Sequence, residues 1–422
     1  MRFVTGAEVA GRLRDLPDPR RIVVSGNFAT PRALLNLVDH SVDRYRVFVL
    51  NAQGDWPCRD GVVVETPFVG PGVRHDRTLD YLPMRLSLVP RLFHQMRPPD
   101  AVLVQTSVPR RGKVSLGIEV NILPAAIERV RARGGLVVAQ VNPRMPYTLG
   151  DGEIDADDID LGLEVDEALP SPEAPHPDDA TSSIGERAAR FVADGGTLQL
   201  GIGQVPDATA SHLRGRRGLG VWSEMISDGV LGLERAGALA TERPLRASFL
   251  FGSAELYDWV DRNPRLVMTR TEVVNDPARI AANPGMLSLN GALQVDLLAQ
   301  ANASWLGTGI FSGFGGQPDF VVGALHSVGG HAVVGLRSWH DGSAASTVVP
   351  MLDRPVTSLQ HSAIVSEQGC AEIFGRSQRA QARLIIEHVA HPRARSRLWE
   401  AARGLGLGPV PSAGTPASAP GS

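Results

Sequence analysis

The sequence predicts an α/β protein built from two similar domains. Each is expected to be an open, largely parallel sheet with helices on both faces, and the active site is expected in the cleft between them. Three observations support this prediction: short apolar runs alternate with amphipathic stretches, a proline-rich acidic segment divides the chain, and motifs of the first half recur in the second. With 422 residues the chain is long enough for two cores of ordinary size.

The apolar runs are typical of strands that helices cover on both sides. They are rich in Val, Ile and Leu, are largely without polar alternation, and occupy residues 21–25, 101–105, 135–139, 197–201, 332–336 and 363–366. Such runs favour parallel sheets over half-exposed antiparallel ones.

Two motifs occur once in each half. The turn that begins Gly26-Asn27 follows a predicted strand and opens a helix, as does the turn at Gly201, and the spacing is 201 − 26 = 175 residues. Gln105 and Gln300, 195 residues apart, each precede a pair of glycines and another apolar run. Repetition of this kind predicts two related domains, which usually place a site between them.

Composition sets the boundaries. We expect an N-terminal domain over residues 1–165, an acidic proline-rich linker over 166–183, a C-terminal domain over 184–407 and a disordered tail over 408–422. The net charge of −3 gives no reason to expect nucleic acid or an anionic membrane as a partner. Two distant cysteines exclude a disulfide framework and fit a cytoplasmic protein, and no apolar run is long enough to span a membrane.

Glu224 is the strongest candidate for chemistry. It stands in Ser223-Glu224-Met225-Ile226-Ser227-Asp228-Gly229, after Val221 and Trp222, so its carboxylate is expected to be poorly solvated. A desolvated carboxylate has a raised pKa and is a better nucleophile. An acid that interacts with a helix N-terminus is the structural alternative.

Two glycine-rich segments could surround this carboxylate. Gly201 and Gly203 let a backbone approach a ligand, and the helix that follows offers free N–H groups. Pro206 replaces the third glycine of a dinucleotide motif, so a phosphate or thioester contact and a tight structural turn remain equal alternatives. Residues 313–330 hold six glycines in eighteen, which favours an ordered loop whose N–H groups stabilise an oxyanion.

Other polar residues are less informative. Asn275 precedes Asp276-Pro277, where Asp276 is expected to be a helix N-cap, and a plain turn is favoured over a substrate contact. His326 and His331 have no third ligand at a suitable spacing, so we expect no metal site.

Together these elements resemble the acetyl-CoA hydrolase/transferase family, the class I group of 4-hydroxybutyrate and acetate CoA-transferases. The resemblance extends from about Arg21 to Ala402. Its matching stretches include residues 25–31, 112–117, 141–146, 198–203, 224–229, 251–253, 275–277, 315–320 and 390–392.

The resemblance implies a role for each matching residue. Glu224 would be the nucleophile and Asn275 would contact the substrate carboxylate. The CoA- and oxyanion-binding residues would be Gly201, Gly203, Gln204, Val205, Gly315, Gly316 and Gln317, and the substrate pocket would include Asn27, Trp222 and Met225. CoA or acyl-CoA would be a substrate, no cofactor would be tightly bound, and the protein would be a homodimer.

The implied function is transfer of CoA between a short-chain acyl-CoA and a carboxylic acid of the acetate, butyrate or 4-hydroxybutyrate type, through a glutamyl-CoA thioester on Glu224. Acyl-CoA hydrolysis and acyl-CoA binding without turnover are the alternatives, and sugar-phosphate isomerisation is a more distant one. The chain departs from the family pattern at Trp222, Gln294, Ala299 and Gln368, and in segment 357–366, which is shortened and lacks a usual Arg. Of these, Trp222 is expected to narrow the acyl pocket.

Overall fold

The computed structural model describes residues 1–171, 177–354 and 356–408. The first half contains an eight-stranded parallel sheet in the order β1-β11-β8-β6-β2-β3-β4-β5. Its strands are β1 Arg2–Phe3, β2 Arg21–Val24, β3 Tyr45–Phe48, β4 Val62–Thr66, β5 Leu79–Tyr81, β6 Ala101–Thr106, β8 Leu136–Val141 and β11 Leu161–Glu164.

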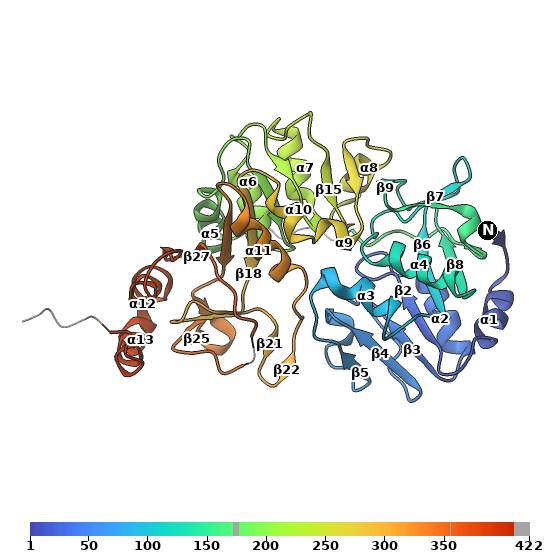
Figure 1. Ribbon diagram of the computed structural model, residues 1–422, viewed down its shortest axis with the longest axis horizontal. Coiled ribbons are helices and arrows are strands. Elements are labelled where there is room, and N and C mark those ends of the chain that lie inside the picture. The colour runs from blue at the N-terminus through green and yellow to red at the C-terminus, as the bar shows by residue number, and fades with distance from the viewer. Residues whose placement is uncertain (172–176, 355, 409–422) are drawn as a thin grey trace, which may run out of the picture.

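Helices cover both faces of this sheet because alternate residues of its buried strands point to opposite sides. One hydrophobic cluster joins Val102 and Val104 of β6 to α3 (Val89–His94) and α4 (Leu123–Ala132). The other joins Leu103 of the same strand to α1 (Gly6–Arg14) and α2 (Arg32–Ser41). The first half occupies the right side of Figure 1.

The second half contains a six-stranded sheet in the order β13-β12-β18-β23-β27-β28, parallel except for β28. Its strands are β12 Thr197–Leu200, β13 Gly220–Val221, β18 Met286–Gly291, β23 His331–Gly335, β27 Ala363–Ser366 and β28 Gly369–Glu372. Helices α5 (Asp179–Ala189) and α6 (Gln204–His212) pack on one face, and α10 (Pro277–Ala281) and α11 (Gln317–His326) pack on the other. The predicted α/β class with largely parallel sheets is confirmed.

The repeated motifs correspond only in part. Strands β2-β6-β8-β11 match β12-β18-β23-β27 in order, so the turns at Gly26 and Gly201 follow equivalent strands. The glycine pairs also precede equivalent strands, β8 and β23. In the second repeated motif the two glutamines do not occupy equivalent positions, because Gln105 lies within β6 whereas Gln300 follows β19 (Gln294–Asp296). The second half inserts a small sheet, β20-β19-β26, at that point.

The predicted linker is partly helical. Helix α5 begins at Asp179, inside the segment 166–183, because the side chain of Asp178 accepts a hydrogen bond from the Thr181 N–H at 2.9 Å and caps the helix. Residues 172–176 of that segment, and all of the predicted tail except Gly408, lie outside the described residues.

Backbone hydrogen bonds join the two halves around their junction. Strand β9 (Leu149–Gly150) of the first half extends the sheet of β15 (Leu245–Ala247) and β17 (Leu266–Met268). Residue 119 bridges to β16 (Phe249–Leu250), which pairs with β14 (Met225–Ile226). The N–H groups of Val69 and Leu86 donate to the carbonyls of Ser312 and Gly315. The segments that carry the candidate residues are therefore held by both halves.

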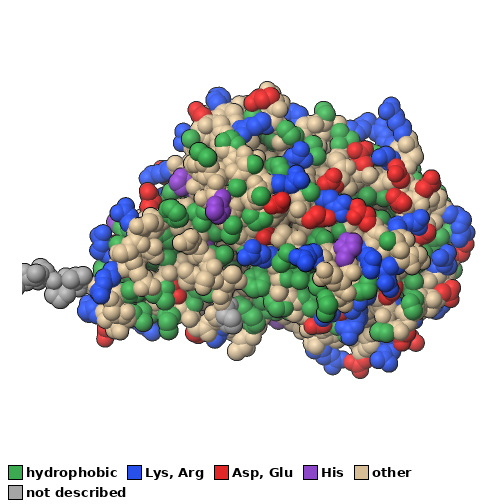
Figure 2. Space-filling model, in the orientation of Figure 1, with side chains coloured by type: hydrophobic (Ala, Val, Ile, Leu, Met, Phe, Trp, Pro, Cys, Tyr) green, Lys and Arg blue, Asp and Glu red, His purple; other side chains and the backbone are tan. Residues whose placement is uncertain are grey.

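The remaining elements are short, except for the 13-residue helix at Pro392–Gly404. They are β7 Lys113–Ser115, β10 Glu153–Asp155, α7 Asp228–Arg235, α8 Ala254–Val260, α9 Thr271–Val274, β20 Ala301–Asn302, β21 Trp305–Leu306, β22 Gly309–Ile310, β24 Trp339–His340, β25 Ala345–Ser346, β26 Val348–Val349, α12 Gln378–Leu384 and α13 Pro392–Gly404, with single turns η1 Pro71–Val73, η2 Leu86–Leu88, η3 Ala156–Asp158, η4 Asp341–Ser343 and η5 Ile385–Val389. None of the described helices has the length and apolar character needed to cross a bilayer. Figure 2 shows basic and acidic side chains mixed over the first half.

Candidate active site

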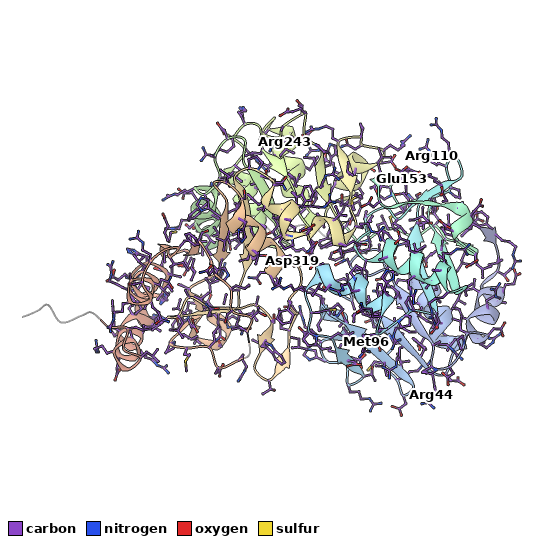
Figure 3. The ribbon with its side chains drawn as sticks, viewed as in Figure 1. Arg44, Met96, Arg110, Glu153, Arg243 and Asp319 are labelled. Carbon is purple, nitrogen blue, oxygen red and sulfur yellow. The ribbon has the colours of Figure 1, made fainter. Side chains whose placement is uncertain are left out.

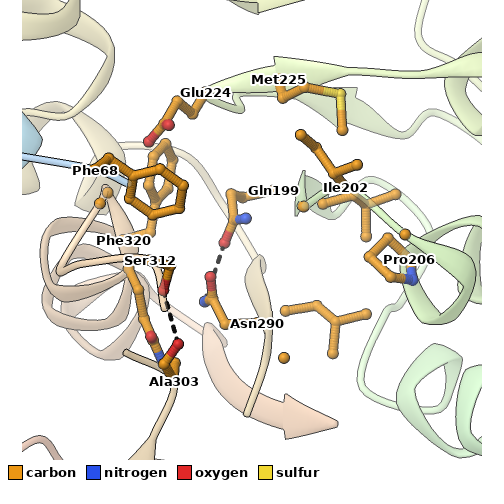
Figure 4. A pocket seen from close by; sticks show the side chains of 18 of the residues that line it. Phe68, Gln199, Ile202, Pro206, Glu224, Met225, Asn290, Ala303, Ser312 and Phe320 are labelled. Carbon is orange, nitrogen blue, oxygen red and sulfur yellow. Dashed lines mark hydrogen bonds between the residues drawn. The ribbon is translucent and has the colours of Figure 1, made fainter. Parts of the chain in front are cut away.

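A cavity of about 570 Å³ opens between the two halves. The first half contributes Asn27, Asn51, Phe68 and Asn121, and the second contributes the turn after β12 and the loop before α11 (Figure 4). The predicted site residues that line it are Asn27, Gly201, Gly203, Gln204, Val205, Glu224, Met225, Gly315, Gly316 and Gln317. The structure therefore brings together segments that are up to 290 residues apart (317 − 27).

Glu224 lies where the chain passes from β13 to β14. Its main-chain carbonyl accepts hydrogen bonds from the N–H groups of Ser248, at 2.8 Å, and Phe249, at 3.0 Å. These bonds fix the backbone, so the side chain extends into the cavity beside Phe68 and Phe320 (Figure 4). The carboxylate is accessible from the cavity and is otherwise enclosed by protein.

Asn275 holds this carboxylate. The Nδ2 group of Asn275 donates to Glu224 Oε2 at 3.1 Å, and the asparagine itself is fully buried at the end of α9. The next residue, Asp276, caps α10 through Ala278, as expected. The turn and the contact with the candidate nucleophile are thus both present.

Trp222 lies outside the residues that line the cavity, which differs from the prediction. Its indole Nε1–H donates to the carbonyl of Val274 at 2.8 Å, and its ring packs against the cluster formed by α10, α11 and β18. The indole is directed to the backbone behind Asn275. Its contact nearest to the site is therefore with the backbone next to Asn275, and it does not line the cavity.

Gly316 is in direct contact with the carboxylate. A Cβ atom on Gly316 would lie 2.0 Å from Glu224 Oε2 and 2.4 Å from Asn275 Nδ2, so no larger residue fits without displacement. Helix α11 begins at the next residue, Gln317, and has no side-chain cap. Pro318 has no N–H and the N–H of Asp319 donates to the Gly316 carbonyl, so the donor that α11 presents at the cavity is the N–H of Gln317, as stabilisation of an oxyanion requires.

The turn after β12 brings a second helix N-terminus to the cavity. Gly203 has φ 121° and ψ 178°, a conformation that is essentially restricted to glycine, and α6 begins at the next residue without a side-chain cap. Added Cβ atoms on Gly201 and Gly203 would meet no other atom within 4 Å. The segment is therefore a tight structural turn that also leaves open space and free N–H donors on the cavity side.

Comparison with known proteins identifies the family. Residues 252–402 match the model of the acetyl-CoA hydrolase/transferase C-terminal domain. The chain is 38% identical over 331 residues to 4-hydroxybutyrate coenzyme A transferase of Clostridium kluyveri, an alignment that covers 76% of each protein. The chain belongs to the acetyl-CoA hydrolase/transferase family.

Two further similarities extend over nearly the whole chain. A succinyl-CoA:acetate/propanoyl-CoA:succinate CoA transferase of Fasciola hepatica is 32% identical over 416 residues, which are 92% of this chain and 85% of that protein. The crystal structure of RipA from Yersinia pestis superposes with a TM-score of 0.88 at 26% identity, over 96% of this chain and 98% of the other. The arrangement of both halves is thus shared with a solved structure.

In this member of the acetyl-CoA hydrolase/transferase family the candidate nucleophile is near a second acid. Burial raises the pKa of Glu224 to about 7, the hydrogen bond from Asn275 opposes this shift, and the charge of Asp319 adds to it. Asp319 lies at the junction of the halves, on α11, and is bonded by the hydroxyl and N–H groups of Ser87 (Figure 3). Burial raises its own pKa to about 6.

Sequence reasoning missed a third acid, Glu119. It is 1% exposed, and its Oε2 accepts a hydrogen bond from Asn27 Nδ2 at 2.7 Å. Burial raises the pKa of Glu119 to about 8, Asn27 opposes this, and the charge of Glu224 adds to it. The signal was available in the sequence, because Glu119 is a single acid in the apolar run 116–123, the same feature that drew attention to Glu224.

Proposed function

We propose that this chain is a CoA-transferase that moves CoA between a short-chain acyl-CoA and a carboxylic acid, of the acetate, butyrate or 4-hydroxybutyrate type, through a glutamyl-CoA thioester on Glu224. One observation carries the proposal: Asn275 and Gly316 hold the Glu224 carboxylate in a cavity between the halves of a chain of this family. The proteins it resembles include enzymes named as CoA transferases for 4-hydroxybutyrate, succinate and acetate.

The reaction has two exchanges at carbonyl carbons. A Glu224 oxygen attacks the carbonyl carbon of acyl-CoA, the C–S bond breaks, and an acyl-glutamyl anhydride and CoA thiolate form. The thiolate attacks the glutamyl carbonyl carbon, the anhydride C–O bond breaks, and the first carboxylate leaves. The second carboxylate then attacks the glutamyl-CoA thioester, and the same steps run in reverse to release the new acyl-CoA.

Several features of the site support this chemistry. Phe68, Phe249 and Phe320 line the cavity next to Glu224 and limit access of water to the anhydride. The N–H of Gln317 at the start of α11 offers a donor for each oxyanion, and the N-terminus of α6 offers donors to polar groups of CoA. Although burial raises the pKa of Glu224 to about 7, about half of the carboxyl groups are still ionised at pH 7, and the poorly solvated anion is a reactive nucleophile.

Mass spectrometry tests the proposal. After incubation with acetyl-CoA, hydroxylamine should convert the glutamyl thioester to a hydroxamate on the peptide that contains Glu224. The variant Glu224→Ala should lack the adduct and the transfer activity. An unmodified Glu224 peptide in wild-type protein that transfers CoA would contradict the assigned nucleophile.

Hydrolysis is the second candidate, since the family includes acetyl-CoA hydrolases and water is an alternative attacking group. Release of CoA from acetyl-CoA, measured with and without added butyrate, separates hydrolysis from transfer. An acyl-CoA-binding protein without turnover would bind acetyl-CoA and give neither product nor adduct. The proposed reaction needs no tightly bound cofactor, and we propose that the protein acts as a cytoplasmic homodimer, which sedimentation analysis would test.

A further inference from the structure

Glu119 lies close to the candidate nucleophile although the proposed reaction gives it no part. Its backbone bridges to Phe249, and Phe249 pairs with Met225, the residue after Glu224. Two adjacent strand spacings separate the backbones of the two acids, about 10 Å. The two carboxyl groups therefore belong to one site, one at the cavity and one behind its wall.

The hydrogen bonds of Glu119 lead back to the cavity. Asn27 donates from Nδ2 to Glu119 at 2.7 Å and accepts at Oδ1 from Asn51 Nδ2 at 2.8 Å, so the orientation of its amide is fixed. Asn121 also hydrogen bonds Glu119, and its Oδ1 accepts from Thr271 at 2.9 Å. Asn27, Asn51 and Asn121 all line the cavity, whereas Glu119 is 1% exposed.

No cation neutralises this acid within the described residues. On the elements packed around it, the acidic groups are Glu224 and, beyond it, Asp319 on α11. Arg270, next to Thr271, pairs with Glu128 and Glu272. Burial and the charge of Glu224 both raise the pKa of Glu119, which therefore holds its proton while Glu224 is ionised.

We propose that Glu119 is a positioning residue that exchanges one proton with solvent during the cycle, protonated whenever the cavity holds another carboxylate and ionised when Glu224 is a thioester. This inference rests on the proposed function, because it requires that Glu224 loses its charge on forming glutamyl-CoA. When the thioester forms, the neighbouring charge disappears, the pKa of Glu119 falls, and its proton passes to water. When the acceptor carboxylate enters, its negative charge raises the pKa of Glu119 again, and Glu119 takes a proton back from water.

Binding of the acceptor is then linked to partial uptake of a proton by Glu119. The Michaelis constant for acetate should rise as the pH increases toward 8 and level off above it, because acetate must draw a proton back onto Glu119. The expected total rise is roughly tenfold, which corresponds to unit charges about 10 Å apart at an effective dielectric constant near 20.

Substitution of Glu119 separates charge from shape. Glu119→Gln retains an oxygen that accepts from Asn27 but cannot ionise, so its Michaelis constant for acetate should not change with pH. Glu119→Leu removes the acceptor and should impair transfer at every pH. If Glu119→Gln shows the same pH dependence as wild type, the acid has only a structural role and the inference is wrong.

A binding measurement supplies a test that does not depend on turnover. In Glu224→Gln protein the neutral amide stands for the neutral thioester, and acetate is titrated calorimetrically near pH 7.5 in two buffers with different heats of ionisation. Uptake of about half a proton per acetate is expected, which is what a tenfold change in affinity allows at this pH. In the same Glu224→Gln background, the added substitution Asp319→Asn is the matched control and should leave the proton uptake unchanged. The added substitution Glu119→Gln should abolish the proton uptake. No uptake, or uptake lost with Asp319→Asn, would overturn the role of Glu119.

The adduct test on Glu224 decides the proposed function separately. An adduct on Glu224, together with an unchanged pH dependence in Glu119→Gln, would reject only the inference about Glu119. An absent adduct in active wild-type protein would reject the glutamyl-CoA pathway itself.

Discussion

Replacement of Gly316 by alanine tests the geometry of the site most directly. The φ of Gly316 is −88°, which alanine adopts without strain, so the substitution acts through its added methyl group alone. That Cβ would lie 2.0 Å from Glu224 Oε2 and 2.4 Å from Asn275 Nδ2. Because carbon and oxygen atoms that are not bonded stay more than 3 Å apart, the carboxylate must move by about 1 Å.

A displacement of this size should lower the reaction rate strongly and change the stability of the fold only slightly. A misplacement of about 1 Å at a reacting group lowers the rate by about 10²-fold. We therefore expect kcat for transfer of CoA from acetyl-CoA to butyrate to fall about 100-fold. Yield of the Glu224 adduct at short times should fall in parallel.

Gly291→Ala is the matched control. Gly291 lines the same cavity, but a Cβ there would meet nothing within 4 Å, so kcat should stay near the wild-type value. Thermal unfolding of both variants shows whether they are folded. Wild-type activity in folded Gly316→Ala protein, or an equal loss in Gly291→Ala, would show that the contact between Gly316 and the carboxylate has no part in the reaction.

Three further substitutions give distinct outcomes. Glu224→Gln should increase the free energy of unfolding by roughly 3 kcal/mol above about pH 8 and leave it nearly unchanged below about pH 4.5. The reason is that a carboxyl whose pKa is raised to about 7 in the folded state destabilises the fold as the pH rises. Urea titration at several pH values measures the free energy of unfolding. Trp222→Phe removes the indole bond to Val274, and should lower kcat by freeing Asn275 without changing acyl-chain preference, which a panel of acyl-CoA substrates would show. Gly203→Ala should cost about 1–3 kcal/mol in chemical denaturation because alanine resists φ 121°, and unaltered stability would contradict that reason.

The elements that sequence predicted well are those whose physical requirement is local. Buried parallel strands need continuous apolar runs, and all six predicted runs contain strands of the two large sheets. The turn at Gly203 needs a backbone that only glycine adopts readily. In both cases the residue type is visible in a short window of sequence.

The elements that sequence missed depend on long-range contacts. The position of Trp222 two residues before Glu224 in the chain suggested the same pocket, but the indole is directed to Val274, 52 residues away. Helix α5 began earlier than the pattern predicted because of one capping residue, Asp178. Asn275 was assigned to a turn by its neighbours, and only the fold shows that its side chain also reaches Glu224.

Burial of an acid does not by itself distinguish a structural role from a reactive one. Glu65 is fully buried like Glu119, but Arg21, Arg46 and Arg97 surround its carboxylate. Burial alone would raise the pKa of Glu65, and the three arginines outweigh that effect and lower it.

Glu119 and Glu224 have amide partners where Glu65 has cations. An amide donor orients a carboxylate without cancelling its charge, so the pKa values of both acids stay raised. Burial of these two acids therefore lowers the stability of the folded state. A carboxylate that is oriented but not neutralised retains the reactivity that a nucleophile needs, and the proton exchange with solvent proposed for Glu119 needs the same absence of cations. Since glutamate is the residue at all three positions, only the identity of the partner, brought near by folding, separates the structural acid Glu65 from Glu224 at the cavity and Glu119 behind its wall.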